Sequence, residues 1–270
     1  MPVDIAEPIV AFALTDLAGR PRDGHLPDRR FYAASTMKVA VLVDVFRRHD
    51  AGVADLDSHV TVATTFRSAV DGSSFTIDAD DVDAELSARV GDEVSIRYLA
   101  ERMITVSSNE ATNLLLQLSG FDGIAVLLDD LGAQGTVVQR LLDDGCARAA
   151  GRDNLVTPAD LSRLMTAIAG GAAASPRSCA EMLAILGRQH YQDEIPAALP
   201  TGTRVANKTG WVTGILHDTA LVWPPDAAPY CLTVCTEGFP DQQAARQAIQ
   251  QISARVWARR EPVDRGEPNL

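Results

Sequence analysis

Residues 33–43 read AASTMKVAVLV, an almost wholly apolar run that contains a single cation, Lys38, near its centre. A lysine is almost never fully buried unless a polar group pairs with it. Ser35 precedes it by three residues, so on a helix the two side chains share one face, one turn apart. A helix that begins near Ser35 also surrounds its hydroxyl with free N–H groups and the positive dipole end. The pattern predicts a serine nucleophile activated by lysine; in the alternative, Ser35 only caps the helix and Lys38 extends to water.

Two other short motifs follow in the chain. Residues 107–109 read SSN, in a turn between two apolar helical segments, and residues 208–210 read KTG. Taken alone, the first motif also fits a helix cap and the second a solvated strand lysine. Together with Ser35 and Lys38, they resemble the Ser-x-x-Lys, Ser-Asp-Asn and Lys-Thr-Gly set of serine β-lactamases and penicillin-binding proteins, most closely the class A branch. The resemblance spans about residues 8–258.

The resemblance implies a role for each matching residue. Ser35 attacks an acyl carbonyl, Lys38 takes or relays its proton, and Ser107 protonates the departing nitrogen beside Lys208. Asn109 and Thr209 bind the amide side chain and the carboxylate of the substrate, and the backbone N–H groups of Ser35 and Trp211 form an oxyanion hole. The residues implied as catalytic are Ser35, Lys38, Ser107 and Lys208, and those implied as substrate-binding are Asn109, Thr209, Gly210, Trp211 and His217.

The chain departs from the family in the loop that carries the water-activating glutamate of class A β-lactamases. Residues 140–154 contain no glutamate, and Leu142 stands where that glutamate is expected. Asp143 and Asp144 are candidate deacylation bases, but each is one methylene shorter and is displaced by one or two positions. A displacement of about 1 Å can cost about 100-fold in rate. We therefore favour the alternative that both aspartates are loop acids held by Arg140 or Arg148.

Three further departures concern the substrate pocket. Ser108 replaces the family's aspartate, which braces the turn. His217 falls where many class A enzymes carry an arginine for the substrate carboxylate, and the adjacent Asp218 is placed to set its tautomer. The alternative for these two is a His–Asp pair at the rim of the sheet. Trp211 is bulky at a position that is normally small, which predicts a narrower pocket with an apolar wall.

Two hypotheses follow for the function. The first is a serine hydrolase of the β-lactamase type that forms an acyl-enzyme on β-lactams or related amides and esters and deacylates slowly. A D-alanyl peptidase or an esterase-like hydrolase would use the same residues. The second is a non-catalytic descendant that only binds acyl or peptide ligands. The retained acylating residues favour the first, whereas the missing glutamate favours the second or a slow enzyme.

Composition limits the partners. The 270 residues carry a net charge of -12, which argues against nucleic acid as a ligand. No stretch approaches the roughly 18 to 20 apolar residues of a membrane span. Acids and prolines occupy the amino terminus in place of a signal peptide's positive charge and apolar run, so we expect a cytoplasmic protein, or a periplasmic or secreted one if a leader has been removed. We expect a monomer that acts on small molecules.

Cysteine and histidine spacing indicates neither a metal site nor a cofactor. None of the 4 cysteines and 5 histidines forms a C-x-x-C or H-E-x-x-H pair, which disfavours a zinc hydrolase. Cys231 and Cys235 lie four residues apart in an expected strand, about 13 Å between their Cα atoms, which is beyond disulfide reach. Both are expected to be buried free thiols.

Periodicity predicts an α+β fold in which both termini supply one antiparallel sheet. Strands are expected over 9–14, 203–211, 215–223 and 230–237, helices over 35–48, 95–103, 110–119, 123–131, 157–169, 178–186 and 241–259, and loops with short helices over 53–93. The resemblance implies a three-layer αβα arrangement with an inserted, mostly helical subdomain. Residues 1–30 and 200–260 would form the sheet subdomain, 31–199 the helical subdomain and 261–270 a tail, with the active site between the subdomains.

Overall fold

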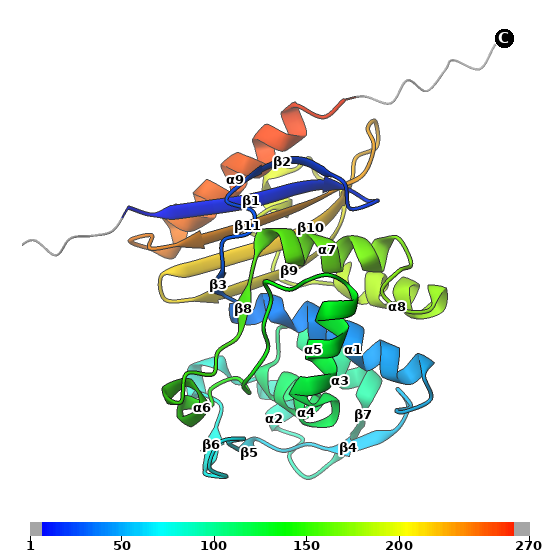
Figure 1. Cartoon of the computed structure of the whole chain (residues 1–270), viewed down its shortest axis with the longest axis vertical. Coiled ribbons are helices and arrows are strands. Elements are labelled where there is room, and N and C mark those ends of the chain that lie inside the picture. The colour runs from blue at the N-terminus through cyan, green and yellow to red at the C-terminus, as the bar shows by residue number, and fades with distance from the viewer. Residues whose placement is uncertain (1–6, 262–270) are drawn as a thin grey trace, which may run out of the picture.

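A computed structural model describes residues 7–261, with a five-stranded antiparallel sheet at one end and a helical part at the other (Figure 1). The strand order is β2-β1-β11-β10-β9. These strands are β1 Ile9–Asp16, β2 Pro21–His25, β9 Arg204–Val212, β10 Ile215–Trp223 and β11 Tyr230–Glu237. Both ends of the chain therefore build the sheet, as predicted. Edge strand β2 was not predicted because its sequence, PRDGH, is exposed throughout and has no apolar alternation.

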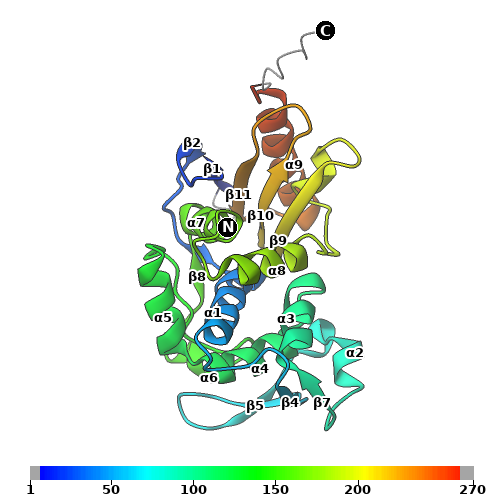
Figure 2. The same cartoon turned by 90° about the vertical axis from the view of Figure 1, so that its right-hand side faces the viewer.

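Helices lie on both faces of the sheet and form the outer layers (Figure 2). The helices are α1 Lys38–Asp50, α2 Ala84–Ser87, α3 Ile96–Thr105, α4 Asn109–Ser119, α5 Phe121–Asp130, α6 Gly145–Ala149, α7 Pro158–Ala169, α8 Pro176–Leu186 and α9 Gln242–Ala258, with 3-10 turns η1 Ala34–Met37, η2 Ala79–Asp81 and η3 Pro196–Ala198. Helix α9 packs on β10 and β11 from one side, and α7 packs on β1, β10 and β11 from the other. Ala11 and Phe12 of β1 enter the two separate cores, because successive strand residues point to opposite faces. The predicted αβα layering is confirmed.

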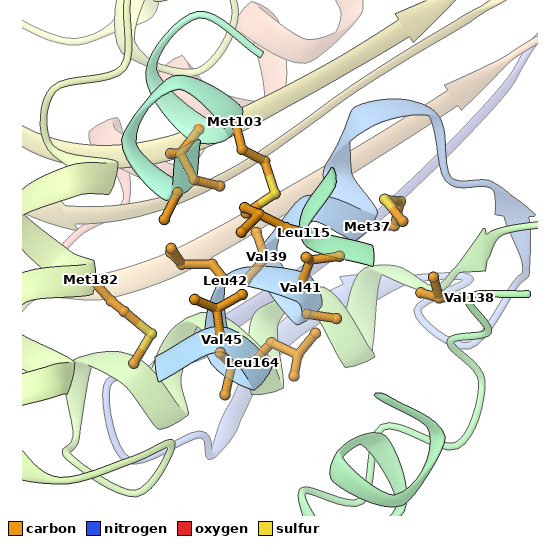
Figure 3. Packing of buried hydrophobic residues seen from close by; sticks show 14 of the residues in the cluster. Met37, Val39, Val41, Leu42, Val45, Met103, Leu115, Val138, Leu164 and Met182 are labelled. Carbon is orange, nitrogen blue, oxygen red and sulfur yellow. The ribbon is translucent and has the colours of Figure 1, made fainter. Parts of the chain in front are cut away.

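Helix α1 passes through the middle of the helical part and explains the apolar run of residues 33–43. Every residue from Lys38 to Phe46 is buried, as expected of a helix that is apolar all round. Figure 3 shows Val39, Val41, Leu42 and Val45 of α1 among side chains of the surrounding helices, including Met103, Leu115, Leu164 and Met182. A core on every side fixes the position of the helix start, where Ser35 and Lys38 lie.

Residues 53–93 contain short two-stranded ladders that the sequence did not predict. The pairs are β4 His59–Thr61 with β7 Glu93–Ser95, and β5 Thr65–Arg67 with β6 Ser74–Thr76; a third pair joins β3 Phe31–Tyr32 to β8 Leu155–Val156. Strands of two or three residues are too short to show alternation. The expected short helices are present as η2 and α2. The division into two subdomains stays a prediction, although α7 and α8, from the region assigned to the helical subdomain, contact the sheet.

Within residues 7–261, no single helix is long and apolar enough to cross a membrane. Helices α4 and α5 meet that length and composition only when taken as a pair, and they are bent by 84° relative to each other.

Candidate active site

Three distant segments meet around one cavity of about 380 Å³. Ser35 comes from η1, Ser107 from the turn before α4, Asn109 from the first position of α4, and Trp211 from β9; all four line the cavity. The two lysines of the motifs, Lys38 and Lys208, are fully buried. The fold therefore brings together the residues that the sequence singled out.

Lys38 is held by the SSN turn. Its Nζ donates to the carbonyl oxygen of Ser107 at 2.7 Å, to Ser107 Oγ at 3.2 Å and to Asn109 Oδ1 at 2.7 Å. The lysine does not extend to water, and Ser35 does not cap a helix, because η1 and α1 start without a side-chain cap. Ser35 was the partner expected from the sequence, but its hydroxyl makes no hydrogen bond to any described residue. The predicted nucleophile is therefore unengaged, and the hydrogen bonds of Lys38 go to Ser107 and Asn109 instead.

Lys208 approaches the same serine from the opposite side. Its Nζ donates to Ser107 Oγ at 3.0 Å and to the carbonyl oxygen of Thr209 at 2.7 Å. Burial lowers the pKa of Lys208 to about 7, against the opposing effect of the negative charges of Asp218 and Glu194. Burial first, and then the charge of Lys208, lower the pKa of Lys38 well below its ordinary value. Because Ser107 Oγ accepts from both amines, its own proton is free to be donated elsewhere.

Backbone strain is concentrated at this cavity. Four non-glycine residues of the described chain have left-handed φ angles, and three of them line the cavity: Ala34 at 44°, Ser107 at 59° and Asp143 at 62°. The fourth, Leu26, lies elsewhere. Left-handed backbone costs energy for residues with a Cβ atom and persists only where the surrounding structure imposes it. The residue before the nucleophile, the central serine and the loop acid are all held in this way.

Gly210 allows β9 to approach the nucleophile. A Cβ atom at this position would lie 2.7 Å from the backbone nitrogen of Ser35 and 2.8 Å from that of Thr36. No side chain fits at such distances, so the glycine of the KTG motif is required by this close approach. The contact places the backbone of β9 directly against the start of η1.

The sequence matches the family described as "Beta-lactamase enzyme family" over residues 6–259. The chain belongs to this family of serine hydrolases. A beta-lactamase of Bacillus amyloliquefaciens is 29% identical over 167 residues, which cover 60% of this chain and 55% of that protein. The match thus spans little more than half the length of that curated relative.

Two solved structures extend the similarity over nearly the whole chain. A beta-lactamase from Sphaerobacter thermophilus superimposes with a TM-score of 0.80 at 30% identity and covers 94% of this chain and 93% of its own. PBP-A superimposes with a TM-score of 0.79 at 25% identity, with coverage of 94% and 90%. A leucine-to-glutamate variant of PBP-A has been solved as an acyl-enzyme complex with penicillin G. The fold and the family inferred from the motifs are confirmed.

Leu142, which the sequence predicts to stand where class A β-lactamases carry their glutamate, is held by two hydrogen bonds. Asn113 Nδ2 donates to the carbonyl oxygen of Leu142 at 3.0 Å, and the Leu142 N–H donates to Asn113 Oδ1 at 2.8 Å. Leu142 also lines the cavity and is 6% exposed. The backbone of Leu142 is thus fixed beside the cavity, but the side chain that it presents there is apolar. Asn113, four residues after Asn109 on α4, is a positioning residue that the motifs did not reveal.

The two aspartates of this loop have different positions. Asp143 lines the cavity, and its Oδ2 accepts from the N–H of Asp78 at 3.2 Å. Asp144 is 1% exposed and caps α6 by accepting from the N–H of Ala147 at 2.9 Å. The expected pairing with a loop arginine is wrong: Arg140 pairs with Asp153 at 3.0 Å, and no described ion pair joins either aspartate to an arginine.

Arg148, the other arginine considered, has its guanidinium carbon 5.8 Å from the centre of the Tyr32 ring. The same ring lies 5.4 Å from the guanidinium carbon of Arg140. Both arginines therefore support the wall of the cavity at Tyr32, which is the role the sequence could not assign.

His217 does not reach the cavity. It is fully buried, its Nε2 lies 3.0 Å from the carbonyl oxygen of Tyr32, and its Nδ1 accepts from the N–H of Thr236 at 3.2 Å. The backbone, not Asp218, therefore sets the tautomer with the proton on Nε2, and burial lowers the pKa of the ring. Asp218 instead accepts from Asn207 Nδ2 at 3.1 Å, because neighbouring strand residues face opposite sides of the sheet. A His–Asp pair at the rim is also excluded.

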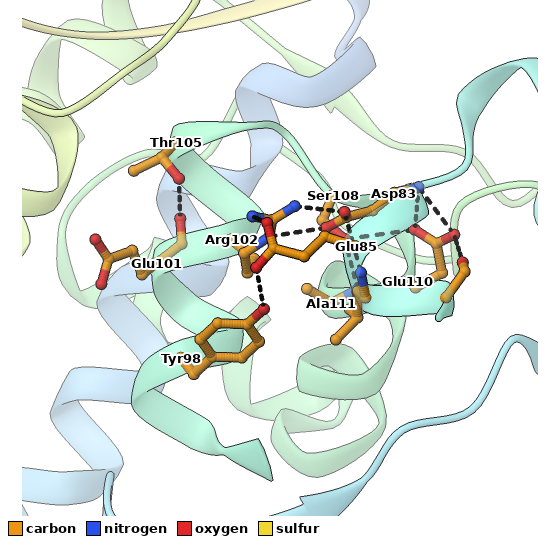
Figure 4. Close-up of polar contacts among 11 residues, drawn as sticks. Asp83, Glu85, Tyr98, Glu101, Arg102, Thr105, Ser108, Glu110 and Ala111 are labelled. Atoms are coloured by element: carbon orange, nitrogen blue, oxygen red, sulfur yellow. Dashed lines mark hydrogen bonds and ion pairs between the residues drawn. The ribbon is translucent and has the colours of Figure 1, made fainter. Parts of the chain in front are cut away.

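The SSN turn is braced by a polar network (Figure 4). Ser108 Oγ accepts from the N–H of Ala111 at 3.2 Å and lies 3.4 Å from Glu110 Oε2. Glu110 is fully buried and accepts from the N–H of Asp83, whose carboxylate binds Arg102. Serine in place of the family's aspartate therefore still caps α4 and connects the turn to its neighbours.

The remaining substrate-pocket residues are placed as follows. Trp211 packs edge-on against Tyr191, with ring centroids 4.8 Å apart, and both line the cavity. The sequence did not single out Tyr191. Thr209 is fully buried, and its Oγ1 has no hydrogen-bond partner. In the described part of the chain, no group of three or more histidine, cysteine or acidic side chains could hold a metal ion, and Cys231 and Cys235 are buried free thiols.

Proposed function

We propose that this protein is a serine enzyme that β-lactams acylate at Ser35 and that releases the acyl group slowly. The observation that carries the proposal has two parts. Lys38 and Lys208 both contact Ser107 at the cavity that Ser35 lines, and the neighbouring loop presents Leu142, whose backbone is hydrogen-bonded to Asn113, to the same cavity. Acylation and deacylation need different groups, and only those for acylation are present.

Acylation begins with an unengaged Ser35 hydroxyl and needs Lys38 as a neutral amine, which keeps at most two of its three donated hydrogen bonds. Ser35 Oγ attacks the β-lactam carbonyl carbon, and its proton passes to Lys38, whose lowered pKa favours the neutral amine. Lys38 already contacts Ser107 Oγ, so the proton can continue through this hydroxyl to the lactam nitrogen as the C–N bond breaks. The products are an ester at Ser35 and, on the opened ring, a neutral secondary amine whose N–H proton came from Ser35.

The cavity offers groups for the rest of the substrate. Asn109 uses its Oδ1 on Lys38, which leaves its Nδ2 to donate to the amide carbonyl of the acyl side chain. The close contact between β9 and η1 supports an oxyanion hole formed by the N–H groups of Ser35 and Trp211, each typically worth about 3 to 4 kcal/mol. The resemblance assigns the substrate carboxylate to Thr209, whose hydroxyl has no partner but is fully buried and does not line the cavity, so the side chain must become accessible when substrate binds.

Deacylation lacks a placed base. Leu142 cannot accept a proton from water, Asp144 caps a helix, and Asp143 is already bonded to the N–H of Asp78. The similarity to PBP-A, a variant of which is known as a penicillin G acyl-enzyme, is consistent with a long-lived ester. Water would then reach the ester with little assistance.

Intact mass after incubation with penicillin G tests the proposal. We expect an adduct of one penicillin per chain that persists long after excess drug is removed, and no adduct on Ser35→Ala. Fast turnover of penicillin G with nothing trapped by acid quench would refute slow deacylation. An unmodified wild-type chain that still binds penicillin G would indicate the non-catalytic alternative.

A further inference from the structure

The cavity that contains Ser35 is lined by many acids, whereas the two lysines of the site are buried behind its lining. Lys38 and Lys208 both contact Ser107 Oγ. Residues 80–85, in η2 and after it, line the cavity and form most of its acidic wall. The acids that line this cavity are Asp80, Asp81, Asp83, Glu85 and Asp143.

The acidic wall carries an excess of negative charge, which the charge of the buried Lys38 offsets only in part. Arg102 is the one arginine that lines the cavity, and it is already paired with Asp83 and Glu85. Asp80 and Asp81 form no ion pair with any other described residue. Burial and then the charges of Asp143 and Asp78 raise the pKa of Asp81, as expected when like charges crowd together. A cation placed here would relieve that repulsion.

Two aromatic rings line the same cavity as these acids. Asp81, Trp211 and Val212 also line a neighbouring cavity of about 520 Å³, so Asp81 lies where the two cavities adjoin at the end of β9. Trp211 and Tyr191 face this region, and none of the described arginine–ring contacts involves either ring. An aromatic face opposite a carboxylate is a favourable site for an ammonium group.

We infer that this wall selects substrates whose acyl side chain carries a positive charge. The preferred substrate is then a zwitterion, with its carboxylate near Lys208 and Thr209 and its ammonium group between Asp81 and Trp211. An anionic side chain would be repelled by the same acids. The inference rests on the proposed acylation of Ser35 and adds the charge of the substrate.

Three penicillins separate charge from shape. Penicillin G, ampicillin and carbenicillin share one nucleus and one phenyl group, and they carry hydrogen, an amine or a carboxylate on the same side-chain carbon. Acylation rate constants would be measured by quenched mass spectrometry at about pH 6, where an α-amine is protonated. Each is divided by the compound's own hydrolysis rate in alkali, which removes intrinsic reactivity.

We expect ampicillin to acylate fastest and carbenicillin slowest, with each step about threefold to tenfold, the range for one charge a few ångströms from an unpaired carboxylate near the surface. The spread should shrink in about 1 M salt, where the Debye length falls to about 3 Å. In the double variant Asp80→Asn, Asp81→Asn, the ratio of ampicillin to carbenicillin should move towards one. Asp122→Asn, which removes an equal charge from an exposed position on α5, should keep the wild-type ratio.

Equal normalised rates for the three compounds in the wild-type protein would overturn the inference and leave acylation intact. The same holds if the double variant keeps the full ratio. The wild-type comparison needs no variant, so a misfolded double variant does not remove the test. If none of the three compounds modifies Ser35, the proposed function itself fails, and the charge preference fails with it.

Discussion

Two buried amines share one hydroxyl at the centre of this site, and their proximity determines which of them is charged. Lys38 and Lys208 both donate to Ser107 Oγ, and both have lowered pKa values because burial penalises the ammonium form. Two ammonium groups this close also repel each other. With the pKa of Lys208 lowered to about 7, the pair is not expected to carry two positive charges above that pH.

Replacing Lys38 with arginine should separate proton transfer from charge. Arginine keeps the positive charge but cannot deprotonate, so Lys38→Arg should lower the acylation rate constant for penicillin G by about 100-fold or more. Lys208→Arg should lose less, because the role proposed for Lys208 needs a cation. Both are measured by quenched mass spectrometry. Near-normal acylation by Lys38→Arg would mean that Lys38 acts only through its charge.

Gly210 gives a second test at the scale of one residue. The added methyl group of Gly210→Ala would meet the backbone nitrogens of Ser35 and Thr36 at 2.7 and 2.8 Å, so β9 or η1 must move. A displacement of about 1 Å at a nucleophile can cost about 100-fold, and we expect a loss of that order in acylation. Gly145→Ala is the matched control, since a Cβ atom there has nothing within 4 Å. Equal acylation by the two variants would show that the close approach is unimportant.

At the scale of elements, the loop of residues 140–154 has a backbone held beside the cavity but no side chain there that is placed to act as a base. Two hydrogen bonds of 2.8 and 3.0 Å between the Asn113 side chain and the Leu142 backbone hold this backbone in place. A different side chain at position 142 would therefore leave the backbone in the same direction as that of Leu142. A glutamate there would reach the cavity that Leu142 already lines. Only the side chain, and not the loop, needs to change.

Leu142→Glu should therefore shorten the life of the penicillin G adduct by at least about tenfold, because a positioned general base contributes about 10² to 10⁴ in rate. Leu142→Gln is the matched control, with the same length and no basic oxygen, and should leave the adduct persistent. Adding Asn113→Ala to Leu142→Glu should cancel much of the gain. Time-resolved intact mass measures all three, and an equal gain from glutamine would exclude base catalysis.

The aspartates of the same loop provide a separate prediction. If Asp143 or Asp144 activates water, its change to asparagine should lengthen the adduct's life without slowing its formation. From their contacts we expect little change in the adduct's life from Asp143→Asn. Asp144→Asn should mainly lower stability, and by no more than about 1 kcal/mol, because asparagine also caps helices. Adduct decay and urea unfolding distinguish these effects.

Elements with a strong local pattern were predictable from the sequence. Strand β11 was predicted with its observed bounds, and α7 begins where Thr157 and Pro158 predict, with Thr157 accepting from the N–H of Asp160. Strand β2 has no such pattern, and its pairing with β1 is decided by the neighbouring strand. Local sequence specifies periodicity and caps, whereas edge strands and short ladders depend on what lies beside them.

At the scale of the whole molecule, the motifs identified the residues of the site but not their partners. Lys38 was expected to meet Ser35, three residues away, and instead bonds to Ser107, which is 69 residues away in sequence. His217 was expected in the cavity and is held between two backbone groups from other segments. The acidic wall was also not foreseen. These contacts depend on tertiary packing, which spacing along the chain does not encode.

The buried acids behind the sheet give a prediction for the stability of the whole fold. Asp218 is fully buried, and burial followed by the charge of Glu194 raises its pKa from 3.8 to about 8. Burial also raises the pKa of Glu194. Between about pH 4 and 8 the folded protein thus keeps protons that the unfolded chain releases. These two acids therefore make a contribution to the free energy of unfolding that falls as pH rises through this window.

One such group contributes a slope of at most about 1.4 kcal/mol per pH unit. Lys208, Lys38 and His217 act in the opposite direction, because burial lowers their pKa values and the unfolded chain binds protons that the folded protein has released. Urea unfolding at about pH 5, 6 and 7 is therefore used to compare the slopes of the wild type and its variants. Asp218→Asn cannot titrate, so its free energy of unfolding should fall less, or rise more, with pH than that of the wild type, whereas the exposed control Asp122→Asn should keep the wild-type slope. Equal slopes for the wild type and Asp218→Asn would show that Asp218 is ionised in the folded protein throughout this range, with Lys208 as the cation that stabilises its charge beneath the active site.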